Sequence, residues 1–228
     1  MLAVLALTTL GESAMAQDVS YSWFEIGVIG QDASRSGSDY NPLLDQTVDI
    51  NTKDGTGVRF RGSIGTWHNL YAFFDYASVD PAVDAVVTNS QGEMFPASDE
   101  FDLTTITGGF GYKYSLNFTT DLYAEVSYDS LDFDFGSFAG ENFDTGDTGP
   151  GATIGIRKMF SDNFQGRAHA RYTSVGNADL DTQTVSSDTL FGIGFGYTFI
   201  RGLSIELDYE TGDIDAWSLG IRLGLDED

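Results

Sequence analysis

Residues 191–225 read FGIGFGYTFIRGLSIELDYETGDIDAWSLGIRLGL, and apolar residues alternate in this stretch with glycine or polar residues. Phenylalanine, isoleucine and tyrosine alternate with glycine over 191–199, and apolar residues alternate with serine and acids over 203–210. A period of two places successive side chains on opposite faces of an extended chain, which indicates β-strands. Arg201-Gly202 and Gly212-Asp213 interrupt the alternation with residues that tight turns favour. The stretch therefore predicts three consecutive antiparallel strands.

The same alternation recurs along most of the chain and predicts an all-β protein. Abundant glycine (27 residues), abundant phenylalanine (17) and scarce proline (4) are consistent with this class. We expect about ten strands, with eight as the alternative if one or two segments are misassigned. The predicted strands are 20–30, 56–66, 70–79, 103–115, 121–134, 151–160, 164–175, 188–200, 203–211 and 215–225. Segments of this length suit a tilted crossing of a lipid bilayer.

The connections between these strands are alternately short and long. Short turns fall at 67–69, 116–120, 161–163 and 201–202, and long connections rich in Asp, Ser, Thr and Gly fall at 31–55, 80–102, 135–150 and 176–187. This asymmetry predicts an antiparallel up-and-down transmembrane β-barrel with short periplasmic turns and long acidic extracellular loops. A secreted β-sandwich also alternates, with its apolar face inside. The turn asymmetry favours the barrel. So do Tyr and Trp near strand ends, namely Trp23, Trp67, Tyr71, Tyr112, Tyr114, Tyr172 and Trp217, which we expect at the membrane interfaces.

The first sixteen residues have the pattern of an export signal. A short apolar run over 2–10 precedes Ser13-Ala14-Met15-Ala16, which predicts cleavage after Ala16 and a barrel domain over 17–228. Because no Lys or Arg precedes the apolar run, a start further upstream is left open. No later stretch has about 18 consecutive apolar residues, which leaves a periplasmic protein, an extracellular protein or an outer-membrane barrel. The strand pattern favours a barrel of the bacterial outer membrane among these.

The net charge of the chain limits the kinds of molecule that it is expected to bind. The formal net charge is −24 at pH 7, which argues against binding of nucleic acid. The excess acid lies mainly in the predicted loops, whose oxygens are able to attract divalent cations. The segment over 144–147, DTGD, lacks the spaced ligands of a calcium loop, so no metal site and no cofactor are predicted. The chain has no cysteine and therefore no disulfides.

The polar faces of the predicted strands carry most of the cations and a matching set of acids. A barrel of eight to ten strands is narrow enough for side chains to fill, and unpaired charges inside it would be unfavourable. We therefore expect an ion-pair network in the lumen, in which closure of the barrel brings Arg222 next to Glu25. Its predicted members are Glu25, Arg59, Arg61, Asp75, Lys113, Glu125, Asp129, Arg157, Arg167, His169, Arg171, Glu206, Asp208 and Arg222.

Candidates for catalysis are few. His68 lies in a predicted periplasmic turn, and His169 lies near the middle of a strand that faces the lumen. Outer-membrane enzymes with a catalytic His place it at the outer rim, so His169 is expected to be a hydrogen-bond partner in the lumen. The sequence shows no Cys nucleophile, phosphate loop or zinc motif, and no enzymatic activity is predicted.

The last strand resembles the C-terminal signal that the barrel assembly machinery recognises. Its pattern comprises Ser218, Gly220, Leu223 and Leu225, although Leu225 stands where an aromatic residue is usual and three further residues follow. With 21–30, 57–80, 108–129 and 192–225, the chain resembles the small OmpA/OmpX/opacity-type outer-membrane barrels. The resemblance implies insertion by the assembly machinery and contact with outer-membrane lipid and lipopolysaccharide. It also implies roles from envelope integrity to adhesion or weak porin activity. A structural or surface-interaction role is expected first, a narrow porin-like channel second, and a rim enzyme acting on lipid or peptide third.

Overall fold

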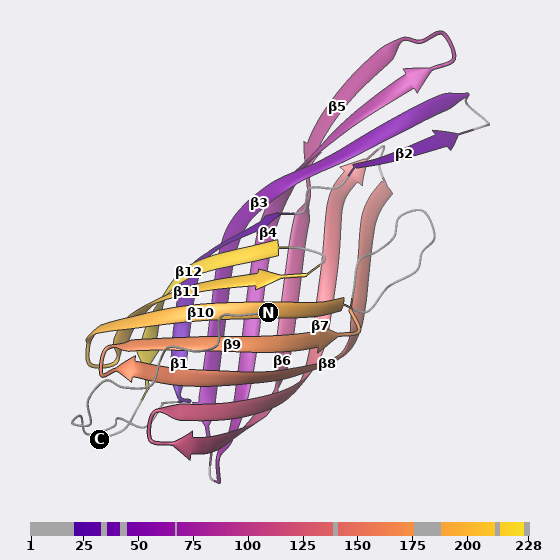
Figure 1. Ribbon diagram of the computed structural model, residues 1–228. Coiled ribbons are helices and arrows are strands. Elements are labelled where there is room, and N and C mark those ends of the chain that lie inside the picture. The colour runs from indigo at the N-terminus through magenta and orange to yellow at the C-terminus, as the bar shows by residue number, and fades with distance from the viewer. Residues whose placement is uncertain are drawn as a thin grey trace, which may run out of the picture.

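The computed structural model describes residues 21–32, 36–41, 45–66, 68–138, 141–175, 188–212 and 215–225. Strands form all of the regular structure in these residues (Figure 1). They are β1 (Trp23–Asp32), β2 (Ser36–Asn41), β3 (Gln46–Gly65), β4 (Leu70–Asn89), β5 (Met94–Glu100), β6 (Asp102–Asn117), β7 (Thr120–Phe138), β8 (Glu141–Ser161), β9 (Phe164–Thr173), β10 (Asp188–Ile200), β11 (Leu203–Thr211) and β12 (Asp215–Gly224). Within the described residues, no helix is long and apolar enough to cross a bilayer. The predicted signal segment 1–16 lies outside the described residues, as does the connection 176–187.

Ten of the twelve described strands close into a ring. The order is β3-β1-β12-β11-β10-β9-β8-β7-β6-β4, and pairing of β4 with β3 closes it, while β2 and β5 stand outside. All pairings are antiparallel, and β1 pairs with β12 from Trp23↔Gly224 to Asp32↔Asp215. The predicted fold class and the count of ten barrel strands are confirmed, and the eight-stranded alternative is wrong.

The wall of the ring turns apolar side chains outward and charged side chains inward. On β12, Leu219, Ile221 and Leu223 are about half exposed, whereas Ser218 and Arg222, which alternate with them, are buried. On β10, Phe191, Ile193, Phe195 and Tyr197 point outward and are exposed, and Gly192, Gly194 and Gly196 occupy the inward positions between them. A sandwich would bury the large residues instead. This belt of exposed apolar side chains is the surface that a barrel presents to lipid.

Three of the predicted long connections, 31–55, 80–102 and 135–150, are largely strands rather than loops. The last of them consists mostly of the outer ends of β7 and β8, which pair with each other as far as Phe138↔Glu141. Residues 46–52 of β3 and 83–89 of β4 continue past the ring and pair with each other, while β2 and β5 pair along their outer sides. The result is a four-stranded sheet, called here the projecting sheet, which rises from one end of the barrel in Figure 1. β3 and β4 each have 20 residues. A tilted crossing of the hydrocarbon layer needs only about 9–11 residues, so half of each strand lies beyond the membrane.

The wall reverses its polarity toward this outer end. On β4, Ala77 and Val79 point inward and are buried, while Asp80 points outward and is exposed. On β6, Leu103 is buried inside and Asp102 is exposed outside. Acids facing outward would be unfavourable in lipid. The reversal therefore marks where the wall leaves the bilayer and stands in water.

Two residues of the predicted aromatic girdles do not face the membrane. Trp23 and Tyr71 are buried and line the lumen, because they share the inward face of their strands with Glu25 and Asp75. Tyr112, Tyr114, Tyr172 and Trp217 are exposed on the outer face, as an interfacial girdle requires. Trp67 lies outside the described residues.

Candidate functional site in the barrel lumen

A buried cluster of charged residues lies inside the periplasmic half of the ring. Arg61 of β3 contacts Glu25 of β1 and Asp208 of β11, and Asp208 also pairs with Arg167 of β9. Arg222 of β12 binds the second oxygen of Glu25 through Nε at 3.1 Å and Nη2 at 2.8 Å. Arg222 also lies 3.3 Å from Glu206 Oε1. These contacts form a continuous chain from β3 through β1, β12 and β11 to β9. Since β3 and β9 lie half a turn apart in the ring, the ion pairs link opposite walls through the lumen.

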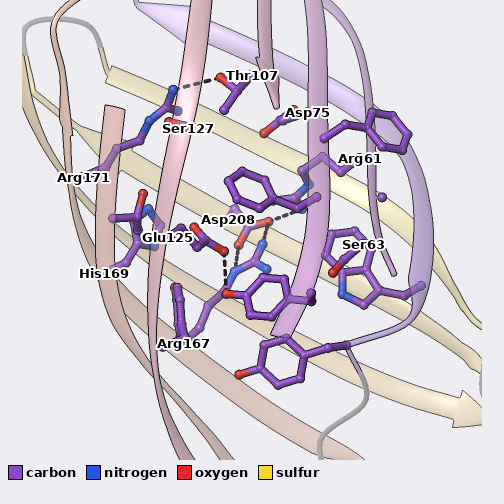
Figure 2. Close-up of a pocket in the computed structure, with 18 of the residues that line it drawn as sticks. Arg61, Ser63, Asp75, Thr107, Glu125, Ser127, Arg167, His169, Arg171 and Asp208 are labelled. Atoms are coloured by element: carbon purple, nitrogen blue, oxygen red, sulfur yellow. Dashed lines mark hydrogen bonds and ion pairs between the residues drawn. The ribbon is translucent and has the colours of Figure 1, made fainter. Parts of the chain in front are cut away.

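A second layer of ion pairs lies on the outer side of this cluster. Arg59 Nε donates to Asp75 Oδ1 at 2.9 Å, and Arg59 Nη1 donates to Ser218 Oγ at 3.2 Å. Arg171 Nη2 lies 3.1 Å from Asp129 Oδ2 and donates across the lumen to Thr107 Oγ1 at 2.9 Å. Figure 2 shows Arg171 and Thr107 reaching toward each other, from strands that β7 and β8 separate in the ring.

His169 belongs to this second layer. Its Nε2 lies 2.7 Å from Glu210 Oε1, inside the barrel on β9 and β11. The side chain is mostly buried, and its position in the lumen matches a hydrogen-bond partner rather than a group at the outer rim.

Aromatic and acidic side chains fill the periplasmic side of the lumen. Tyr71 donates from its hydroxyl to Glu125 Oε1 at 2.8 Å, and its ring packs 4.7 Å from the ring of Tyr21. Lys113 and Arg157 lie over the Tyr21 ring, at 4.9 and 4.6 Å from its centroid. Cation–π contacts of this kind stabilise a charge that has left bulk water.

Inward glycines make room for the charged side chains. A Cβ at Gly194 would lie 2.0 Å from Asp208 Oδ1 and 2.6 Å from Arg167 Nε. A Cβ at Gly196 would lie 2.4 Å from Glu206 Oε1, and one at Gly220 would lie 2.7 Å from Glu25 Oε1. The inward glycines of residues 191–225 therefore leave room for the ion pairs, because any larger residue at these positions would overlap a charged side chain.

Small cavities remain in the described part of the lumen. One of about 110 Å³ is lined by Arg61, Arg167, Asp208 and the aromatic side chains around Tyr71, and ten of its lining residues are labelled in Figure 2. The other, of about 140 Å³, lies toward the outer end and is lined by Ile29, Leu103 and other apolar residues. Arg59, Asp75, Thr107, Arg171 and Glu210 line both cavities and separate them.

All of the predicted network residues lie on the inward face of the wall, and most contact another member or its neighbour. Lys113 and Arg157 are placed at the Tyr21 ring rather than in the central cluster. The prediction missed Asp121, which is 1% exposed and lies opposite Arg157 in the pairing of β7 with β8. Asp121 shares the parity of Glu125 and Asp129, so the same alternation contained the signal.

The comparisons with known proteins agree with this geometry. The family model described as "Outer membrane protein beta-barrel domain" matches residues 2–199. The chain belongs to this family of outer-membrane β-barrels. The protein is accordingly a protein of the bacterial outer membrane, as the sequence predicted. No curated protein matches the chain in sequence.

Several solved barrels are similar to the chain in structure. The β domain of the Bordetella autotransporter BrkA is 11% identical with a TM-score of 0.47, and the match covers 89% of this chain and 98% of that one. Neisserial surface protein A is 15% identical with a TM-score of 0.41, covering 90% and 98%. The attachment invasion locus protein Ail of Yersinia pestis is 15% identical with a TM-score of 0.39, covering 89% and 97%.

The predicted assembly signal lies on β12, at the seam of the ring. Ser218 and Gly220 face the lumen, while Leu223 and Leu225 face outward and are about half exposed. Recognition by the assembly machinery stays a prediction, and so do contact with lipopolysaccharide and the attraction of divalent cations. In the described part of the chain, no group of three or more acids and histidines is placed to hold a metal ion.

Proposed function

We propose that this barrel is a structural and surface-interaction protein of the outer membrane, whose lumen is closed to steady solute flow. The observation that supports this role is the cluster of Glu25, Arg61, Asp208, Arg167 and Arg222, which bridges opposite walls. Opening a path through it would separate buried charges from their partners, and breaking a buried ion pair in this way costs about 3–5 kcal/mol.

The projecting sheet supports the surface-interaction part of the proposal. In the part of the chain that the structure describes, β2 and β5 are the edge strands of this sheet, and the sheet carries exposed side chains such as Met94 and Phe95. Unpaired strand edges and exposed apolar residues are features of surfaces that contact other molecules.

Conductance in planar lipid bilayers tests the closed lumen. The purified full chain should give no steady conductance steps. The double variant Glu25→Ala/Arg61→Ala removes one pair without changing net charge, leaves Arg222 with Glu206 and Arg167 with Asp208, and should produce steps. The matched control Lys53→Ala/Asp84→Ala removes an exposed pair on the projecting sheet and should stay silent. Steady conductance of the unaltered protein, at the level of the double variant, would contradict the proposal.

A narrow channel for small solutes is the second candidate, because the two lumen cavities share a common layer of residues. It predicts reproducible conductance of the unaltered chain that changes in Arg59→Ala or Asp75→Ala.

A further inference from the structure

The larger cavity combines apolar walls with a charged floor. Ile29, Ala77, Leu103 and Leu131 line it from β1, β4, β6 and β7, and Leu190 lines it from β10. Ile29, Ala77 and Leu103 are at most 3% exposed and point inward. The cavity is thus a small, partly apolar space in the outer half of the lumen, at the level where the outward face of the wall changes from Val28 and Ile106 to Asp102.

The size of this cavity fits one small ring. Its volume is about 140 Å³. A cavity of about 150 Å³ lined by Leu, Ile and Phe in a protein core is known to bind benzene. A six-membered ring is therefore the largest rigid apolar body that we expect the walls to accept.

The floor offers hydrogen-bond acceptors more than donors. Arg59 and Arg171 already donate to Asp75, Ser218 and Thr107. By contrast, Asp129 Oδ1 and Gln31 Oε1 are buried and have no hydrogen-bond partner in the part of the chain that the structure describes. Asp129 is only 3% exposed, and its other oxygen accepts from Thr173 Oγ1 at 2.7 Å. Since an unsatisfied buried acceptor is unfavourable, this site favours a ligand that donates hydrogen bonds.

The charges of the floor favour a cationic donor. Three carboxylates (Asp75, Asp129 and Glu210) and two guanidinium groups (Arg59 and Arg171) line the cavity. A ligand carboxylate would meet Asp129 Oδ1 at close range and be repelled. An ammonium group would supply up to three donors to the free oxygens of Asp129 and Gln31.

We propose that the outer half of the lumen is a binding site for a small primary amine with an apolar body the size of one ring. The amine lies on the floor against Asp129 and Gln31, and the ring lies among Ile29, Ala77, Leu103 and Leu131. The ion-pair layers lie on the periplasmic side of the site, and binding at the site does not require transport. This inference does not depend on whether the lumen conducts.

Ligand-observed NMR titration of the full chain in nanodiscs tests the proposal, with benzylamine as the probe. Benzoate has the same ring with the opposite charge, and methylamine has the head group without the ring. We expect saturable binding of benzylamine at least tenfold tighter than that of either comparison compound. Equal binding of benzoate would overturn the role of the acidic floor, and equal binding of methylamine would overturn the role of the apolar walls.

Two substitutions on one strand distinguish the cavity from the lipid-facing surface. Ala77→Leu fills the cavity and should weaken benzylamine binding at least tenfold. Ala72→Leu adds the same atoms on the outward face of β4 and should leave binding unchanged. Ala216→Leu, on the opposite side of the cavity, repeats the test if Ala77→Leu fails to fold. Unchanged binding in a folded cavity-filling variant would place the probe in the lipid or on the surface and refute the site.

Discussion

Replacing Glu25 with glutamine tests whether the central cluster holds the barrel together. Glu25 is 3% exposed and accepts from two guanidinium groups: Arg61 Nε at 3.0 Å with Arg61 Nη2 beside it, and Arg222 Nε and Nη2 at 3.1 and 2.8 Å. Glutamine keeps the shape but has one acceptor oxygen, and its amide donors face a guanidinium group. Arg222 then keeps Glu206 and Arg61 shares Asp208 with Arg167, so the buried cluster is left one negative charge short. We therefore expect a loss of about 3–5 kcal/mol in the free energy of unfolding.

Urea titration of unfolding in lipid vesicles or detergent, followed by tryptophan fluorescence, measures this loss. The matched control is Asp84→Asn, the same acid-to-amide change in an exposed ion pair with Lys53, for which we expect a change below about 1 kcal/mol. The double variant Glu25→Gln/Arg61→Gln restores the charge balance and should be less destabilised than the sum of its single variants. If Glu25→Gln loses no more stability than Asp84→Asn, the buried cluster is not what stabilises the closed ring.

Three further predictions concern the wall. Gly194→Val should prevent folding or lower stability strongly, because its Cβ would overlap Asp208 and Arg167. Gly108→Ala should be tolerated, since a Cβ there meets nothing within 4 Å. Protection of the two variants from protease in vesicles measures the difference. Phe110→Arg on the lipid face should cost about 2–4 kcal/mol if it lies near the bilayer midplane, while Phe118→Arg in a short turn should change urea stability little. At the outer end of β6, outside the membrane, partial desolvation and the neighbouring Asp80 raise the pKa of Asp102. The folded state therefore binds this proton more tightly than the unfolded state, and the free energy of unfolding falls as pH rises above 3.8. The urea midpoint of Asp102→Asn should lack this fall.

The alternation of residue types was enough to predict the ring, its strand number and the inward position of the charged residues. Alternation is sufficient for this because successive side chains of a strand point to opposite faces whatever the strand packs against. The seam was predictable too, since an up-and-down ring of antiparallel strands must pair its last strand with its first.

Three features could not be read in the same way. The outer halves of β3 and β4 have mixed polarity, because a sheet standing in water has no lipid to select one apolar face, so their pattern predicts loops. Val79 and Leu103 were not assigned to the lumen, because the rule that polar residues face inward holds only inside the bilayer and reverses above it. Trp23 and Tyr71 were assigned to the girdles by residue type alone, although their parity with Glu25 and Asp75 places them inside.

The pairing of β1 with β12 has a consequence for how the molecule is made. Glu25 and Arg222 are 197 positions apart in the chain, and they become neighbours only when the final strand is in place. Contacts this distant in sequence form late and slowly. Until β12 pairs with β1, the exported polypeptide has two unpaired strand edges and arginines without their carboxylate partners. Both features are unfavourable inside a bilayer. A chain cut short anywhere before Ser218 would therefore be expected to remain a substrate for envelope proteases rather than become a smaller barrel.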